Sequence, residues 1–196
     1  MSRPYERLLA KGEDRRQHIL EMALRLMVTG GGRATTLSQV ARAAGMSTAG
    51  LLHHFPSKEQ LLHAVLDARD ADDAADSDFS GDLEAQLRSV QRRFRREPGL
   101  AGMFIVLMCE NLAPDAPLHD RFIGRYRSGL RLIAGGIKRG QRSGRFRADV
   151  DPALKAREIV AILYGLEATW LLDPDLPVVE VFAGYTHRVV EELCAR

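Results

Sequence analysis

The chain has 196 residues, of which 45% are hydrophobic and 28% charged, and its formal net charge is +2. This composition is that of a globular protein and argues against a disordered chain; the length suffices for one large or two small domains with buried cores. The longest apolar run, residues 103–109, is far shorter than the ~20 residues of a membrane-spanning helix, so we expect no insertion into a membrane.

The two cysteines and the first residues bear on the compartment and on metal binding. Cys109 and Cys194 lie far apart and lack the spacing of a metal site or a CxxC motif. Cys109 belongs to the apolar run, so we expect a buried thiol of the core. The N-terminal residues are charged and lack the apolar segment of about 7–15 residues found in secretory signals. We therefore expect a cytoplasmic protein without a metal site.

Charge is unevenly distributed along the chain. Residues 1–66 contain 9 Lys/Arg and 5 Asp/Glu, a net charge of +4, whereas residues 67–85 contain 1 and 8, a net charge of −7. Residues 86–147 contain 14 and 4, a net charge of +10, and residues 148–196 contain 4 and 9, a net charge of −5. A basic segment suits a phosphate backbone. Two segments therefore compete for a nucleic-acid partner, and motif geometry must decide between them.

An amphipathic helix is predicted over residues 14–28, after a polar arm at residues 2–11. The arm is either a solvated end of the chain or a segment that contacts a nucleic-acid backbone. Three glycines, residues 30–32, end the helix. They lack the Lys-Ser/Thr that completes a phosphate-binding loop, and are interpreted as a turn. The inward stripe of the helix is Ile19, Met22, Ala23, Leu26 and Met27.

Residues 35–62 predict two short helices joined by a tight turn and followed by the start of another helix. Thr35, Thr36 and Ser38 can each cap the first short helix and Ser47 or Thr48 the second, because a hydroxyl accepts hydrogen bonds from the N–H groups of a first turn. Gly45 lies between them, where glycine adopts the left-handed conformation without strain.

The second short helix, residues 48–54, ends before Pro56, because a proline disfavours the helical conformation of the residue before it. Its inward residues are expected to be Leu51 and Phe55. Two short helices joined by a glycine turn form the plan of a helix-turn-helix, whose second helix enters the major groove of DNA.

Three stretches of this region resemble the N-terminal DNA-binding domain of the TetR family of bacterial transcriptional regulators: ILEMALRLM, TTLSQVARAAGMS and LLHHFPSKEQLL. The chain departs from the family at Leu52, where many members carry tyrosine, and at Ala49, where many carry glycine. The resemblance implies a three-helix DNA-binding domain. A fourth helix would link it to a helical bundle that binds a small effector and dimerises.

The second short helix supplies candidate contacts to DNA. Thr48 and His53 face outward and can hydrogen-bond to base edges, and Gly50 lets the backbone approach the groove. The resemblance implies further side chains that hold phosphates from the starts of three helices. His54 is interpreted either as a DNA contact or as a structural residue of the domain. The candidate DNA-binding residues are Thr36, Ser47, Thr48, Ala49, Gly50, His53, His54 and Lys58.

An Asp-rich stretch, residues 67–82, follows the DNA-binding motif. It lacks the glycine and final glutamate of a calcium-binding EF-hand loop. We interpret it as the tail of the fourth helix running into a mobile acidic linker. The predicted domains are a DNA-binding domain, residues 1–66, and a ligand-binding and dimerisation domain, residues 67–196.

The second domain shows helical periodicity throughout, without the alternation of a strand, so the predicted fold is all-α. Proline and glycine residues separate five predicted helices, which begin near residues 83, 100, 119, 152 and 177. The second of them, residues 100–112, is apolar nearly all round and is expected to be buried at the centre of the domain.

Aromatic and flexible apolar side chains of this domain can line a pocket between helices. Any one of these residues is more readily explained as plain core, but the resemblance implies a pocket for a small molecule in the domain as a whole. At the end of the apolar helix, Glu110 and Asn111 are either a helix-end arrangement or a ligand contact. The candidate ligand-binding residues are Phe104, Met108, Phe122, Tyr126 and Trp170.

The last two helices are expected to form a homodimer by pairing as a four-helix bundle. A two-fold dimer presents two recognition helices to a palindromic operator. Alternatively, the apolar stripes pack only within the chain. The predicted stripes are Ile159, Ile162, Leu163 and Leu166 on one helix and Val178, Phe182, Tyr185 and Val189 on the other.

No motif for catalysis is present: the six histidines show no HExxH spacing and no GxSxG occurs, so we expect neither an enzyme nor a cofactor. The expected function is a sequence-specific transcriptional regulator. It would act as a repressor, released from a double-stranded DNA operator by a small apolar or amphipathic effector. One alternative is an all-α enzyme or carrier with an incidental helix-turn-helix-like hairpin. Another is a non-specific nucleic-acid binder that uses the arginines of residues 88–96, which a solvated helix face explains equally well.

Overall fold

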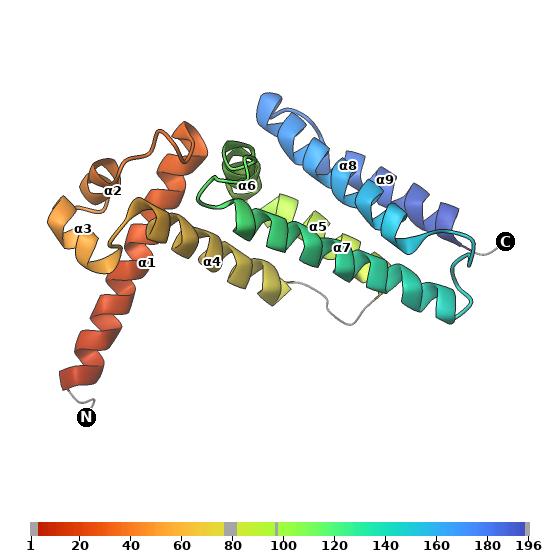
Figure 1. The fold of residues 1–196 in the computed structure, drawn as a ribbon, viewed down its shortest axis with the longest axis horizontal. Helices are drawn as coiled ribbons and strands as arrows, with labels where there is room; N and C mark the ends of the chain where they lie inside the picture. The colour runs from red at the N-terminus through yellow and green to blue at the C-terminus, as the bar shows by residue number, and fades with distance from the viewer. Residues whose placement is uncertain (1–3, 77–81, 97, 195–196) are drawn as a thin grey trace. The chain divides into compact units, whose positions relative to one another are not determined.

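The computed structural model describes residues 4–76, 82–96 and 98–194. Within these ranges the regular structure is nine helices, accompanied by one isolated bridge between Phe146 and Cys194 (Figure 1). The prediction of an all-α fold is therefore confirmed. The chain divides into two compact units, residues 1–71 and 72–196.

Helix α1 (Pro4–Gly30) is longer than predicted. The sequence predicted a polar arm before residue 14, but the helix begins at Pro4, and residues 1–3 lie outside the described part of the chain. Proline is tolerated in the first helical turn, because the N–H that it lacks has no intrahelical partner there. The Glu, Arg, Leu and Ala residues that follow favour a helix. The predicted arm was therefore wrong, whereas the glycine run ends the helix as expected.

Helices α2 (Leu37–Ala43) and α3 (Thr48–His54) form the predicted helix-turn-helix (Figure 1). Between them the chain reverses at Gly45, whose φ is 66°. The N–H of Gly45 donates to the carbonyl of Arg42 at 3.1 Å, and that of Met46 donates to the carbonyl of Ala41 at 2.9 Å. This pair of bonds satisfies the last carbonyls of α2. The buried core of the unit includes Ile19, Ala23, Met27, Val40, Ala41, Leu51 and Phe55.

The positive φ of Gly45 can be tested by substitution. Gly45→Ala is expected to destabilise the protein by about 1 kcal/mol, because a Cβ is strained at positive φ. Gly12→Ala is the matched control: Gly12 lies inside α1 with no atom within 4 Å of an added Cβ. There the substitution should stabilise by about 0.5–1 kcal/mol through helix propensity. Urea unfolding measures both, and equal effects of the two substitutions would contradict the assigned turn.

Helix α4 (Lys58–Asp76) begins after Ser57, whose Oγ accepts a hydrogen bond from the N–H of Gln60 at 3.1 Å. The helix continues through most of the Asp-rich stretch. The boundary expected after residue 66 falls inside α4, and the remainder of the predicted linker, residues 77–81, lies outside the described residues.

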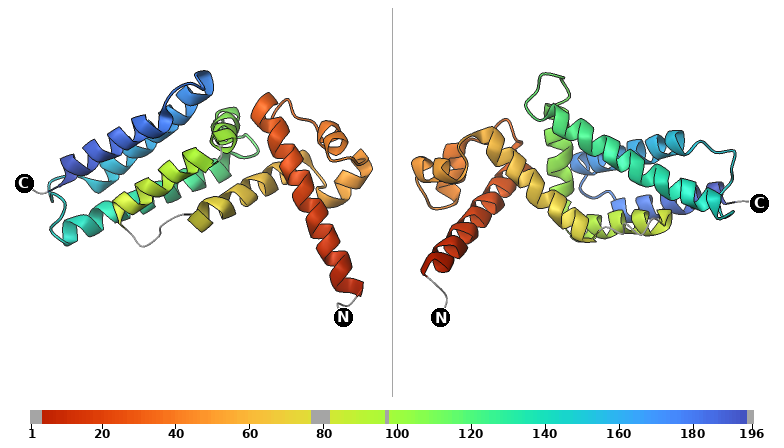
Figure 2. Two further views of the ribbon diagram at one scale, coloured as in Figure 1. Left: turned by 180° about the vertical axis from the view of Figure 1, so that it is seen from behind. Right: turned by 60° about the horizontal axis from the view of Figure 1, so that its bottom comes forward.

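The second unit is a helical bundle. Helices α5, α7, α8 and α9 run alongside one another, and α6 crosses them near one end (Figure 2). The bounds of these helices are α5 Leu83–Arg96, α6 Pro98–Glu110, α7 His119–Arg142, α8 Pro152–Leu172 and α9 Val178–Leu193. No helix among the described residues is long and apolar enough to cross a membrane.

Helix α6 shows that an apolar run does not predict the burial of every residue in it. The helix is largely buried, as predicted, but Cys109 is exposed, so its expected burial was wrong. An all-apolar run predicts a buried helix as a whole and cannot indicate which end its neighbours leave uncovered. Asn111 is buried and ends the helix: its Nδ2 donates to the carbonyl of Leu107 at 2.8 Å, and its Oδ1 accepts from the N–H of Leu118 at 3.3 Å. These bonds support the helix-end interpretation of Asn111.

The predicted dimer stripes of α8 and α9 lie largely inside the monomer, so their assignment to an interface was wrong. An amphipathic stripe identifies a face that must be buried but does not identify its partner. Ile162 is the exception, because 40% of it is exposed. The stripe residues buried in the monomer core are Ile159, Leu163, Val178, Phe182 and Val189.

Candidate nucleic-acid interface

The exposed face of α3 is the centre of the candidate interface. Thr48, Ala49 and His53 are exposed, whereas Leu51 and Phe55 are 0% and 1% exposed and anchor the helix in the core. The predicted outward residues therefore share one face, with Leu52, which is 40% exposed, beside them. The exposed face of α3 therefore has few long polar side chains. Sequence reading by this helix would depend on a hydroxyl, an imidazole and close backbone approach.

The starts of α2 and α3 are held by hydroxyl caps. The Oγ1 of Thr36 accepts from the N–H of Gln39 at 3.2 Å, and the Gln39 side chain accepts from the N–H of Thr36 at 2.7 Å. The Oγ of Ser47 accepts from the N–H of Gly50 at 3.1 Å. These bonds fix the starts of both helices. Space beside Gly50 is limited, because a Cβ added there would lie 3.3 Å from the Oγ of Ser47. Phosphate contacts by Thr36 and Ser47 stay predictions.

Two further candidates make contacts within the domain. The Oγ1 of Thr48 lies 3.4 Å from the Oγ of Ser38, which links α3 to α2. The Nζ of Lys58 donates to the carbonyl of Arg33 at 2.8 Å and ties the start of α4 to the turn after α1. Both side chains are thus pre-positioned at the surface, and their DNA contacts also stay predictions.

Arg16 holds the end of α3, and sequence analysis missed it. Its Nη1 donates to the carbonyl of His54 at 3.0 Å, and its guanidinium lies 4.3 Å from the centroid of the Phe55 ring. His54 lies 38 residues further along the chain than Arg16, and Phe55 follows it directly. The sequence near Arg16 gives only a weak signal of this role, namely that Arg16 precedes the buried Ile19 by about one helical turn. The contact gives His54 a structural role through its backbone.

Arg16→Met is expected to destabilise the protein by about 1–2 kcal/mol, because it removes a charge-assisted hydrogen bond and a cation–π contact. A loosened α3 should also lower affinity for specific DNA about 10-fold, with non-specific affinity little changed. The stability and the DNA affinity of Arg16→Lys should lie between those of the wild type and Arg16→Met, since an ammonium does not reproduce the planar fork of the guanidinium. Arg15→Met, at an exposed neighbouring position, is the control. Thermal unfolding and DNA titrations check these results; equal effects at both positions would contradict the role of Arg16.

The predicted ligand-binding residues separate into different groups in the structure. Phe104 and Phe122 make an edge-to-face contact at 5.3 Å. Trp170 instead packs on Phe94 at 5.9 Å, and its Nε1 donates to the carbonyl of Pro174 at 3.3 Å. Trp170 and Tyr126 both pack against the main hydrophobic core, and Met108 is half-buried. The aromatic residues therefore do not form one cluster.

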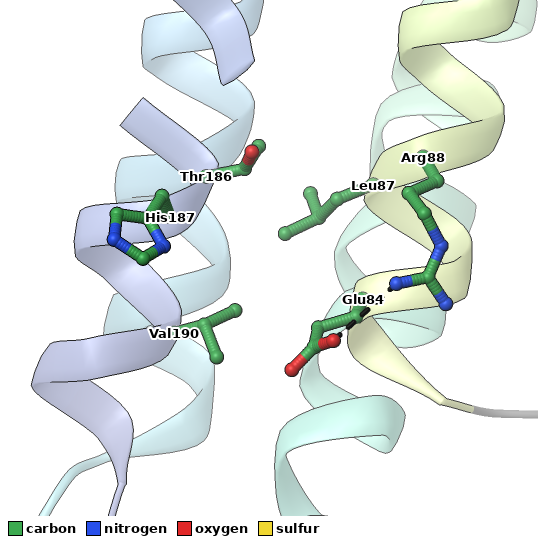
Figure 3. Close-up of a pocket in the computed structure, with 6 residues that line it drawn as sticks. All are labelled: Glu84, Leu87, Arg88, Thr186, His187 and Val190. Carbon is green, nitrogen blue, oxygen red and sulfur yellow. Dashed lines mark hydrogen bonds and ion pairs between the residues drawn. The ribbon is translucent and has the colours of Figure 1, made fainter. Parts of the chain in front are cut away.

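A groove of about 190 Å³ lies between α5 and α9 and contains none of the predicted ligand residues (Figure 3). Its walls are partly charged, and Arg88 pairs with Glu84 at 3.3 Å within it. The lining residues are Glu84, Leu87, Arg88, Thr186, His187 and Val190. Among the residues that the structure describes, no group of His, Cys, Asp and Glu has the arrangement of a metal site.

Two arginines of α5, Arg88 and Arg93, are engaged within the protein. Besides its contact with Glu84, Arg88 lies 3.8 Å from Asp82. Arg93 binds the buried Glu167 at 2.9 Å. These ion pairs weaken the case for a nucleic-acid surface on α5 and leave the helix-turn-helix as the better candidate.

Comparison with known proteins agrees with this geometry. Residues 19–65 match the family model described as bacterial regulatory proteins, tetR family. The chain is 38% identical over 74 residues to the HTH-type transcriptional regulator SrpR of Pseudomonas putida, covering 38% of this chain and 34% of that protein. It is 27% identical over 160 residues to the HTH-type transcriptional repressor KstR2 of Mycolicibacterium smegmatis, covering 74% of each.

Solved structures extend the likeness to the second unit. A transcriptional regulator from Saccharomonospora viridis, in complex with choline, matches with a TM-score of 0.78 and 24% identity. The match covers 94% of this chain and 100% of that chain, and it shows a common fold. By contrast, the alignment with SrpR spans only about a third of the length of that relative.

The capped helices α2 and α3, with the exposed face of α3, define a helix-turn-helix protein. Residues 19–65 match the DNA-binding domain of the TetR family of bacterial regulatory proteins. The resemblance inferred from the sequence is therefore confirmed.

Proposed function

We propose that this protein is a sequence-specific transcriptional regulator that represses its target genes by binding a palindromic operator with α3. The observation that carries the proposal is the exposed face of Thr48, Ala49 and His53 on a helix held by a Ser47 cap and by Arg16. A repressor is favoured over an activator because KstR2, which aligns over most of the chain, is described as a repressor. The family match favours a regulator over an enzyme or carrier with an incidental hairpin.

The same proposal includes a homodimer formed by α8 and α9, because two half-sites require two recognition helices. The surfaces available for it differ from the predicted stripes. Leu154 is 64% exposed, Ile162 40% and Leu172 87% along α8, and Val181 on α9 is 39% exposed. Apolar residues exposed on neighbouring helices are suited to a self-complementary two-fold interface.

Release by a small effector completes the proposal. An effector bound in the second unit would favour a spacing of the two recognition helices that does not fit successive major grooves. A change from 1:99 to 99:1 between the two states requires a preference of about 5.5 kcal/mol. Operator affinity measured with and without small molecules tests this part: a ligand that weakens binding supports it, and unchanged affinity across a broad panel counts against it.

A further inference from the structure

The positive charge of the second unit is concentrated on α7. Residues 86–147 carry a net charge of +10, and α7 alone contains seven Arg or Lys residues and a single acid, Asp120. Four of its exposed cations share one face of the helix, because their spacing places them within about 60° of one another and along about 22 Å of its length. These four residues form the basic stripe of α7: Arg127, Arg131, Lys138 and Arg142.

The basic stripe differs from the two paired arginines of α5 in its partners. Arg88 and Arg93 form ion pairs with carboxylates. Among the side chains that the structure describes, no carboxylate forms an ion pair with a cation of the basic stripe. The Nη2 of Arg131 donates to the Oγ of Ser128 at 2.7 Å, a neutral partner that leaves the charge uncompensated. The basic stripe therefore presents its positive charge to the solvent.

Helix stability does not explain the basic stripe. Like charges four residues apart on a helix repel each other, and the pairs Arg127/Arg131 and Lys138/Arg142 both have this spacing. The helix dipole favours a cation in the last turn, which accounts for Arg142 but not for the two arginines in the middle of the helix. The basic stripe is therefore a candidate for binding an anionic partner.

The composition of this face favours a phosphate backbone over a membrane surface. Three of the four cations are arginines, which bind phosphate oxygens through paired hydrogen bonds. A DNA duplex carries one negative charge per about 1.7 Å of its axis, so a row of cations about 22 Å long can meet phosphates along its whole length. A helix that binds to a membrane surface also inserts apolar side chains. None of the large apolar residues that are exposed in the described chain lies on α7.

We propose that the basic stripe of α7 binds the phosphate backbone of double-stranded DNA independently of its sequence. The inference goes beyond the proposed function, because it adds a DNA-binding surface on the second unit to the recognition helix of the first. Contacts to phosphate carry no sequence information. The basic stripe therefore strengthens binding to operator and unrelated DNA alike, whereas α3 distinguishes between them.

The salt dependence of binding to random-sequence DNA tests the proposal, because each phosphate contact contributes about 0.9 to the slope of log K against log[salt]. In the full chain, Arg127→Gln/Arg131→Gln should reduce the magnitude of that slope by about 2, and the further changes Lys138→Gln and Arg142→Gln should bring the reduction to about 3–4. Glutamine favours a helix, so the fold should persist, which circular dichroism checks. Arg127→Lys/Arg131→Lys keeps both charges and should keep the slope of the wild type.

The matched control is Arg25→Gln/Arg95→Gln, which removes the same charge from exposed positions on α1 and α5 and should leave the slope unchanged. An equal reduction by the control would show a general effect of net charge and would overturn the assignment. A wild-type slope in the variants of the basic stripe would overturn it too. If those variants instead lost binding to phosphatidylserine vesicles or to polyglutamate, the partner would be a membrane or an acidic protein.

Sequence recognition by α3 is measured separately, by selection from random DNA. If the wild type enriches a sequence and the variants of the basic stripe keep the wild-type slope, only the assignment of the basic stripe is wrong. If those variants reduce the slope and the wild type enriches no sequence, the proposed regulatory function is wrong and the assignment of the basic stripe stands.

Discussion

The double variant Thr48→Ala/His53→Ala is expected to lose about 100-fold or more in affinity for its operator, because each contact to a base edge contributes about 1–3 kcal/mol. Both side chains are exposed on α3, and the core contacts of that helix are made by Leu51 and Phe55 instead. The unfolding temperature should therefore change little. Affinity for DNA of unrelated sequence should also change little, since phosphate contacts supply most of it.

Gln17→Ala, at an exposed position of α1, is the control for this experiment and should alter neither affinity nor stability. Titrations of operator and unrelated DNA at one fixed salt concentration give the comparison. Specific binding that survives in the double variant would show that α3 does not read the sequence through these residues.

Ile162→Asp is expected to convert the proposed dimer into monomers. Operator affinity should then fall about 100-fold or more, because each monomer can bind only one half-site. Ile162 is 40% exposed and lies on α8 between the exposed Leu154 and Leu172. A carboxylate placed in the middle of a buried apolar interface has no partner, and the cost of an unpaired charge is several kcal/mol. The monomer itself should remain folded, because the core side of α8 is unchanged.

Sedimentation and DNA titration together measure the effect of Ile162→Asp. Ser128→Asp, which adds the same charge at an exposed position of α7, should leave the dimer intact. A wild-type protein that is already monomeric, or a variant that remains dimeric, would remove α8 from the interface.

The helix-turn-helix could be predicted from sequence because its signals are local. Ser47 and Gly45 specify a cap and a left-handed turn within a few residues of where they act, and Leu51 and Phe55 follow helical spacing. Each of these features depends on one or two turns of chain. The structure accordingly places them where the sequence did.

The remaining features depend on contacts between distant segments. Arg16 and His54 are 38 residues apart, and Arg93 and Glu167 are 74 apart, so no local pattern pairs them. Glu167 did carry a signal, because it is the one acid within the largely apolar segment of α8 from Ile159 to Leu172. The partner of Glu167 could not be predicted, because Arg93 lies on α5 and only the tertiary structure brings the two together.

The apolar stripes of α8 failed as predictors of the dimer for a related reason. Periodicity predicted that Ile159 and Leu163 would be buried, which they are. It could not distinguish burial against α7 and α9 from burial against a second copy. Ile162 differs from its neighbours in being exposed in the folded monomer. That exposure depends on tertiary packing, so periodicity could not predict it.

Selection of binding sites from a pool of random double-stranded DNA tests the central claim most directly. The wild-type protein is expected to enrich an inverted repeat whose half-sites lie one helical turn apart, about 34–36 Å, or slightly more. The Thr48→Ala/His53→Ala protein should fail to enrich that repeat. Recovery of no sequence above the starting pool by the wild type, or binding that depends steeply on salt but not on sequence, would contradict the assignment of α3 as a recognition helix.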